Sequence, residues 1–280
     1  MKLLHLINSN RMLTTGIITV IFVVFFGVVG SWFVDKERAD VGAGRPAQPP
    51  SADHWLGTDQ QGRDVFADIV YGTPGTLKIG LIAAIVGVGV GTILGFISGY
   101  FGGYIDSLIR FISDVFMTIP VLMILIILAS LLDVMSNTML GLLIAAFGWM
   151  GALRVTRAQV LTMRERAYVQ VAKLNGVNDM EIIFKEMIPN LLPFIAASLV
   201  AASAGAVLAS LGLSALGLGP QNEPSIGLTI FWVLHYGALI RELWWWFMPP
   251  IIVMVLLFIG LFMITAGLDR IANPRLRTKV

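Results

Sequence analysis

The chain has 280 residues, of which 57% are hydrophobic and only 13% are charged, and its mean hydropathy is +0.84. A soluble domain would carry about 25% charged residues, so this composition indicates a polytopic membrane protein. The net charge is only +2, and the basic residues cluster at the ends of apolar segments, which argues against a nucleic-acid partner. The absence of cysteine excludes disulfides, a thiol nucleophile and thiolate metal ligands.

Six apolar stretches are predicted to cross the membrane as helices. The first carries no charge from Met12 to Val34 and is long enough to span a hydrocarbon core of about 30 Å at about 1.5 Å per residue. The predicted spans are Met12–Val34, Thr76–Phe101, a third that ends near Leu132, Thr138–Leu153, Leu191–Leu213 and a sixth that ends at Leu268. Pro120 is expected to kink the third span, and Pro249-Pro250 to break the sixth early. The first span is too long for a signal-peptide core and no Ala-x-Ala site follows it, so we expect it to be retained.

Residues 35–73 are charged and rich in proline, and they are expected to form an external loop. Thr58 and Gln61 are placed to cap a short amphipathic helix outside the spans. Its apolar side would comprise Val65, Phe66, Ile69 and Val70. Asp59, Arg63 and Asp64 could take part in handling the substrate or could simply hold the loop together through local ion pairs. The second interpretation is favoured.

Small residues are concentrated in the second and fifth spans. Gly87, Gly91, Gly95 and Gly99 recur at every fourth position, which predicts close packing of the second span against another helix. The fifth span must either pack tightly or border a space large enough for cargo. The residues predicted to line the translocation path are Ser198, Ala202, Ser203 and Ala206. Trp244-Trp245-Trp246, just before the sixth span, is typical of an aromatic belt at the membrane interface.

The polar stretch from Arg164 to Asn190 separates the fourth and fifth spans and predicts a helical hairpin. Thr162 with Glu165 has the form of a capping box, and Asn175-Gly176 is typical of a helix end. Asn178 is expected to begin a second helix, with the Glu181 side chain accepting a hydrogen bond from the backbone N–H of Asn178. The apolar residues Met180, Ile183, Phe184 and Met187 fall on one stripe, and Pro189 is expected to end the pattern. The alternative is a plain amphipathic helix lying on the bilayer.

Four motifs resemble those of a known family. Gln170-Val171-Ala172, Gly176 and Ile188-Pro189 keep the spacing of the coupling loop of ABC-importer permeases (Glu-Ala-Ala-x3-Gly-x9-Ile-x-Leu-Pro), with Gln170, Val171 and Glu186 departing from it. The stretches Leu56–Asp64, Leu211–Pro220 and Asn273–Arg277 resemble the C-type permeases of the dipeptide, oligopeptide and nickel uptake family.

The resemblance implies an all-α membrane protein with six transmembrane helices and the type I ABC-importer permease fold. Residues 1–34 would be the N-terminal tail and first helix, 74–268 the ABC transmembrane type-1 domain with its coupling loop at 164–190, and 269–280 a cytoplasmic tail. The residues implied to couple the chain to an ATPase are Gln170, Ala172, Gly176, Asp179, Met180, Ile183, Phe184, Met187 and Pro189.

The implied partners are a second permease subunit, two ATP-binding-cassette ATPase subunits, an external substrate-binding protein and membrane lipid. ATP and Mg would bind to the ATPases, and this chain would bind no cofactor or metal and would carry no catalytic residue. The implied cargo is a dipeptide or oligopeptide, with an oligosaccharide or a nickel chelate as the alternatives.

The sequence also limits the other function classes. It contains no His-Glu-x-x-His or Gly-x-Ser-x-Gly motif, as a membrane hydrolase would require, and no Walker A loop, so any ATP-derived energy must come from another chain. An ATP-independent transporter or channel remains the competing class. Lys and Arg are concentrated on one side of the predicted spans, which places both termini and the Arg164–Asn190 stretch in the cytoplasm of a multi-pass cell (inner or plasma) membrane protein.

Overall fold

The computed structural model describes residues 10–272, and these residues form helices and loops without strands. The C-terminal motif Asn273–Arg277 lies outside the described residues. The helices are α2 (Arg11–Phe33), η1 (Lys36–Ala39), α3 (Val65–Phe101), α4 (Gly103–Thr118), α5 (Val121–Ser130), α6 (Asn137–Arg164), α7 (Ala167–Leu174), α8 (Asp179–Glu181), η2 (Ile182–Met187), α9 (Ile188–Ala215), α10 (Ile226–His235) and α11 (Trp244–Ala272).

The described chain has five helices that are long and apolar enough to cross a membrane: α2, α3, α6, the continuous segment Asp179–Ala215, and α11. Helices α4 and α5 together pass the same test of length and composition, and taken as one span bent by 75° they count as a sixth crossing. The bend lies at Ile119-Pro120, because proline has no N–H to continue the helical hydrogen bonds. The predicted number of spans and the kink at Pro120 are therefore confirmed.

Helix α3 corrects the prediction of a separate amphipathic helix in the external loop. The helix begins at Val65 and continues to Phe101, so the amphipathic segment and the second span are one helix. The N-cap of this helix is Asp64 and not the predicted Thr58. The Asp64 side chain accepts a hydrogen bond from the Ala67 amide at 3.1 Å. At about 1.5 Å per residue α3 is about 55 Å long and extends beyond a hydrocarbon core of about 30 Å.

Other predicted boundaries also change. Helix α11 passes through Pro249-Pro250 without a break, consistent with the tolerance of transmembrane helices for proline. Helix α6 continues to Arg164, well beyond the predicted end at Leu153. The predicted loop before Trp244 contains α10, which the sequence analysis missed. The prediction that Trp244, Trp245 and Trp246 form an aromatic belt is wrong for Trp246, which is buried. Of these three residues only Trp244 is exposed.

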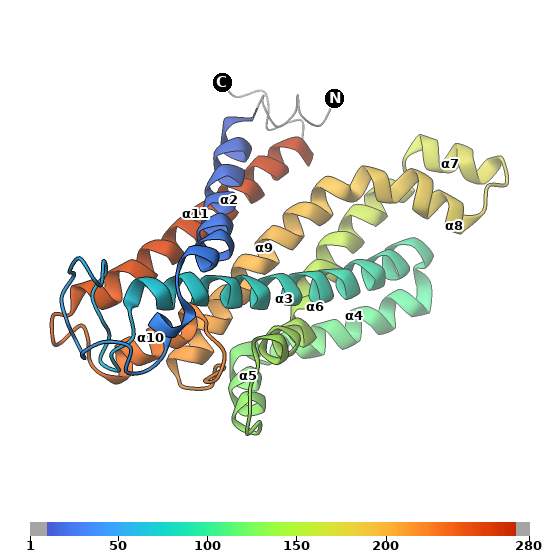
Figure 1. Cartoon of the computed structure of the whole chain (residues 1–280). Helices are drawn as coiled ribbons and strands as arrows, with labels where there is room; N and C mark the ends of the chain where they lie inside the picture. Colours follow the sequence, from blue (N-terminus) through green and yellow to red (C-terminus); the bar gives the residue numbers. More distant parts are fainter. Residues whose placement is uncertain (1–9, 273–280) are drawn as a thin grey trace.

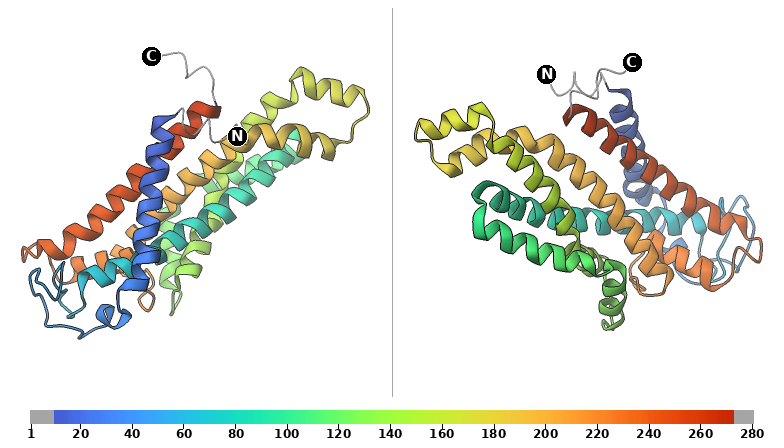
Figure 2. Two further views of the ribbon diagram at one scale, coloured as in Figure 1. Left: turned by 45° about the horizontal axis from the view of Figure 1, so that its top comes forward. Right: turned by 180° about the vertical axis from the view of Figure 1, so that it is seen from behind.

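The glycine stripe of α3 packs against α6, as the sequence predicts. A Cβ atom at Gly91 would lie 2.3 Å from the carbonyl oxygen of Trp149, and one at Gly95 would lie 2.8 Å from the Cβ of Thr156. Only glycine lets the two backbones approach this closely. Helix α3 also packs along α9, and α2 packs along α11 (Figures 1 and 2).

The two ends of the helical bundle carry different structures. The hairpin formed by α7, α8 and η2 projects at one end, on the side where α2 begins and α11 ends (Figure 1). Helix α10 and the loop between α2 and α3 lie at the opposite end (Figures 1 and 2). This arrangement places the start of α2, the end of α11 and the hairpin on the same side, as six crossings require.

Candidate functional site

The candidate site is the hairpin that α7, α8 and η2 form between α6 and α9. Helix α7 ends at Leu174, and the chain turns at Gly176, whose φ of +73° is one that glycine adopts readily. Asn178 caps α8 by accepting a hydrogen bond from the Met180 amide at 3.1 Å. The predicted helix end at Asn175-Gly176 and the second start at Asn178 are confirmed.

Two of the predicted caps are wrong. Thr162 lies inside α6, where its hydroxyl donates to the carbonyl of Ala158 at 3.0 Å, so it does not begin a helix. Glu181 accepts from the Nζ of Lys185 at 2.6 Å and forms an ion pair along the helix. In both cases the side chain bonds to a group one helical turn away and not to a helix end. Helix α6 continues to Arg164, so no helix begins at Thr162.

The predicted single apolar stripe is split by the π-helical turn η2. The amide of Ile188 donates to the carbonyl of Ile183, five residues back, so this turn holds more residues than an α-helical turn. As a result Ile183 and Met187 are buried within the chain, whereas Met180 and Phe184 are 54% and 65% exposed. Only Met180 and Phe184 of the predicted stripe are therefore available to a partner.

Pro189 does not end the helical segment, which corrects the prediction. It lies near the start of α9, directly after the π-helical turn, and the chain stays helical through it from Asp179 to Ala215, consistent with the tolerance of transmembrane helices for proline. The second half of the hairpin is thus continuous with the fifth span.

The remaining predicted coupling residues lie on or near the surface of the hairpin. Gln170, Gly176 and Asp179 are exposed, and Ala172 is half-buried. The side chain of Gln170 donates to the carbonyl of Arg164 at 3.0 Å and so closes the first turn of the hairpin. Burial raises the pKa of the neighbouring Tyr168 phenol, which remains neutral at physiological pH.

The sequence analysis did not identify two exposed apolar residues of α7 as part of the candidate site. Val171 and Leu174 lie three residues apart on one helix face and are 54% and 86% exposed. Their spacing is the signal that could have found them. With Met180 and Phe184 they give the hairpin four large exposed apolar side chains.

The inner face of the hairpin is held against α3 and α6 by apolar packing. The buried cluster joins Phe96 and Tyr100 of α3 to Val160 of α6 and to residues of the hairpin. These hairpin residues are Val169, Ile182, Ile183 and Met187, with Leu191 of α9 beside them. The hairpin is therefore a firm extension of the bundle, with a buried inner face and an apolar outer face.

An ionic clamp lies next to this cluster, where α3, α4 and α6 meet. Asp106 accepts two hydrogen bonds from the guanidinium of Arg157, at 2.6 and 2.8 Å, and one from the hydroxyl of Ser98 at 2.5 Å. Arg110 lies one turn further along α4, 3.3 Å from the same carboxylate. Asp114, a further turn along α4, pairs instead with Arg154 of α6, at 2.6 Å.

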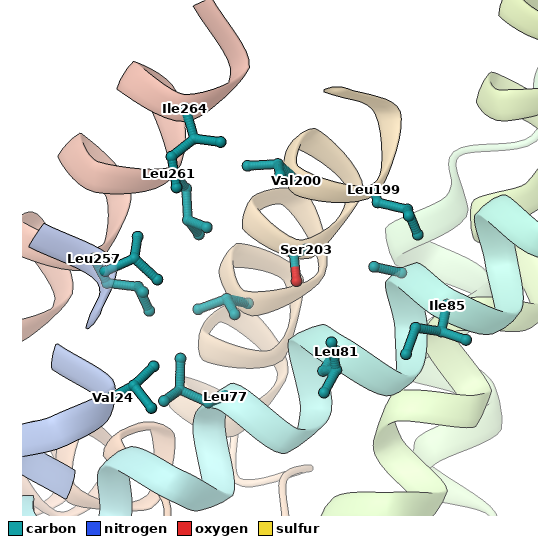
Figure 3. Close-up of a pocket in the computed structure, with 13 residues that line it drawn as sticks. Val24, Leu77, Leu81, Ile85, Leu199, Val200, Ser203, Leu257, Leu261 and Ile264 are labelled. Atoms are coloured by element: carbon teal, nitrogen blue, oxygen red, sulfur yellow. The ribbon is translucent and has the colours of Figure 1, made fainter. Parts of the chain in front are cut away.

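The four residues predicted to line the path do not share one face of α9. Ala206 is buried in the core, and Ser203 lines an apolar cavity of about 480 Å³ between α2, α3, α9 and α11 (Figure 3). Ser198 and Ala202 are half-buried. The exposed face of α9 carries Ala201, Gly205, Leu208 and Gly212.

The loop at the opposite end contains a buried ionic network. Arg63 donates to Asp59 at 2.9 Å, and Asp64 lies 2.8 Å from the Nδ1 of His54. Burial raises the pKa of Asp59, and the Arg63 guanidinium opposes this shift. The same Arg63 reaches Asp68 of α3 at 3.9 Å. These contacts are the local network that the sequence analysis favoured.

Comparison with known families gives this architecture its context. A family model described as the inner membrane component of binding-protein-dependent transport systems matches residues 91–278, more than half of the chain. The chain belongs to this family. The match confirms the resemblance found in the sequence, and with the six crossings it confirms the type I ABC-importer permease fold in a multi-pass membrane protein.

Curated relatives of this membrane component carry transport names. The dipeptide transport system permease protein DppC of Bacillus subtilis is 31% identical over 77% of this chain and 67% of its own length. The oligopeptide transport system permease protein OppC of Mycobacterium bovis is 32% identical over 65% of this chain and 62% of its own length. A putative peptide transport system permease protein of Brucella suis is 28% identical over 96% of this chain and 90% of its own length.

Proposed function

We propose that this membrane component imports dipeptides or oligopeptides together with a second permease, driven by two separate ATPase subunits and supplied by an external substrate-binding protein. The names of the relatives support the cargo class. Oligosaccharides and nickel chelates are the alternative cargoes. Nothing in the described side chains favours them.

The observation that carries the ATP-driven mechanism is the outer face of the hairpin. Met180 and Phe184 are exposed although both are large and apolar, and Leu174 and Val171 extend the same kind of surface onto α7. Such side chains are stabilised when a groove on a partner removes them from water. Because the inner face of the hairpin is packed on the bundle, an ATPase that grips its outer face can move the spans when it closes on ATP.

The exposed face of α9 supports a shared transport path. A Cβ atom placed at Gly205 or Gly212 would meet no described atom of this chain within 4 Å, so the helix is open there. A second permease packed across this face would enclose a path between the two chains. In this arrangement the path is lined by the side of α9 that carries Ala201 and Leu208, and not by Ser203 and Ala206.

The orientation follows from the positive-inside rule. The hairpin carries Arg164, Arg166 and Lys173, and it lies on the same side as the start of α2 and the end of α11. We therefore place the hairpin and both ends of the described bundle in the cytoplasm, and α10 with the α2–α3 loop outside. An ATPase can reach the hairpin only in this orientation.

The test is the Phe184→Asp variant, assayed with the complete transporter in proteoliposomes. A charged side chain at the docking face should abolish ATP-driven uptake of labelled tripeptides, whereas Phe184→Leu, which keeps an apolar side chain, should retain most of it. Normal uptake by Phe184→Asp would refute the docking face. Uptake that persists without any ATPase chain would instead favour the competing class of ATP-independent transporter.

A further inference from the structure

We propose that Tyr100, near the end of α3, is the positioning residue through which movement of the hairpin is passed to α3. The proposal rests on the proposed function, because it assumes that an ATPase moves the hairpin. No sequence motif predicts the contact between Tyr100 and the hairpin. We refer to Tyr100 with Arg164, Lys173 and Asp179 as the Tyr100 junction.

Two segments of the hairpin and the end of α6 converge on this one residue of α3. The Tyr100 hydroxyl donates to a carboxylate oxygen of Asp179, the first residue of α8, at 2.5 Å. The ammonium of Lys173, near the end of α7, lies 4.7 Å from the centre of the Tyr100 ring. Arg164, the last residue of α6, donates from its Nη1 to the Tyr100 carbonyl at 3.2 Å. Tyr100 itself is only 5% exposed.

These contacts suit the transfer of force because they are short, charged and next to the docking face. A hydrogen bond to a carboxylate is stronger and more directional than one between neutral groups. Asp179 precedes the exposed Met180 directly, so a pull on the outer face acts on the residue that Tyr100 holds. These polar contacts lie beside the apolar packing of Phe96 and Tyr100 against the hairpin, at the same end of α3.

Helix α3 then carries the movement to the opposite end of the bundle. Near its outer end, Asp68 accepts a hydrogen bond from the hydroxyl of Thr229 in α10 at 2.7 Å. The hydroxyl of Thr76 accepts from the amide of Ile226, the first residue of α10, at 2.9 Å. A single helix of 37 residues thus contacts the hairpin at one end and α10 at the other. A displacement at Tyr100 reaches the outer side without passing through a flexible loop.

The rival interpretation is that Tyr100 only fills the buried cluster with its ring. Phenylalanine fills nearly the same volume, so Tyr100→Phe removes the hydroxyl and its bond to Asp179 while the ring stays in place. The matched control is Tyr104→Phe on α4, where the tyrosine is 83% exposed. Asp179→Asn is a second probe, because asparagine keeps an acceptor oxygen but loses the charge.

The experiment measures the distance between the hairpin and α3 in the complete transporter reconstituted in nanodiscs. The chain has no cysteine, so Glu186→Cys in η2 and Ile93→Cys in α3 introduce its only thiols for spin labels. Both positions are exposed, and neither belongs to the docking face formed by Val171, Leu174, Met180 and Phe184. Pulsed electron paramagnetic resonance would then report the distance distribution with and without Mg-ATP and vanadate. Melting temperature, basal ATP hydrolysis and uptake of labelled tripeptides are measured on the same preparations.

If Tyr100 transmits the movement, the label pair gives one narrow distance in both nucleotide states for the parent chain and for Tyr104→Phe. Tyr100→Phe should broaden or shift this distance on addition of nucleotide and lower uptake roughly tenfold, the loss expected for one charge-assisted hydrogen bond, with basal hydrolysis retained. Asp179→Asn should have a smaller effect, and the double variant should be no worse than Tyr100→Phe alone.

Two results would overturn the proposal. One is a Tyr100→Phe chain with an unchanged narrow distance and normal uptake. The other is a chain whose uptake falls only in step with its melting temperature, which would show a structural role. Failure of the proposed function looks different: the parent chain itself would then show no ATP-dependent uptake.

Discussion

The close packing of α3 on α6 allows one sharp prediction, built on two glycines of the same helix. A Cβ atom at Gly91 would lie 2.3 Å from the Trp149 carbonyl oxygen and 2.7 Å from the Cβ of Ala152. A Cβ atom at Gly89 would meet nothing within 4 Å in the described chain. Gly91→Ala must therefore push α6 away by about 1 Å to restore normal van der Waals contact, whereas Gly89→Ala requires no adjustment.

The two substitutions make the same change in helix propensity, so their difference isolates the packing. Overpacking of this kind costs about 1–3 kcal/mol. For a chain of this size 1 kcal/mol corresponds to about 2–4 °C in melting temperature, so Gly91→Ala should melt about 2–12 °C below Gly89→Ala. The assay is thermal unfolding of the detergent-solubilised chain followed by tryptophan fluorescence. Equal melting temperatures would refute the close approach of α3 and α6.

Two further predictions concern the polar contacts that fix the ends of α3. Arg157→Lys keeps the charge but loses the two parallel hydrogen bonds to the buried Asp106, so it should lower the free energy of unfolding by about 1–3 kcal/mol. The control is Arg154→Lys, whose ion pair with Asp114 is more than half exposed and which should cost less than about 1 kcal/mol. Equal effects in denaturant titrations would contradict the clamp. Thr229→Val leaves the buried Asp68 without its hydroxyl donor and should cost about 1–3 kcal/mol. Labelling of a cysteine introduced at Ala67, at the outer end of α3, should increase. Thr15→Val, at an exposed position on α2, is the control and should change neither measurement.

The division of the hairpin into an inner and an outer face has a consequence for mutagenesis. Substitution of Ile183 or Met187 disturbs the buried cluster and is expected to affect folding as well as transport. Substitution of Met180 or Phe184 removes exposed side chains and should leave the melting temperature nearly unchanged. Stability measurements therefore separate the residues that hold the hairpin from those proposed to contact the ATPase.

The sequence alone determined the class of protein, the number of spans and the place of the hairpin. These features depend on composition, on the length of apolar runs and on local signals such as Asn175-Gly176, all of which act over a few neighbouring residues. The glycine stripe from Gly87 to Gly99 likewise predicted a close helix contact, because a bare helix face in a bilayer has few other uses.

Only the tertiary structure decided which residues of the hairpin face outward and what holds the hairpin to the bundle. The stripe from Met180 to Met187 is uniform in sequence, but the π-helical turn changes the number of residues per turn and sends two of the four side chains inward. Tyr100 and Asp179 are 79 residues apart, and no local pattern brings them together. Their contact exists because α3 ends where the hairpin folds back, and that position is set by the packing of whole helices.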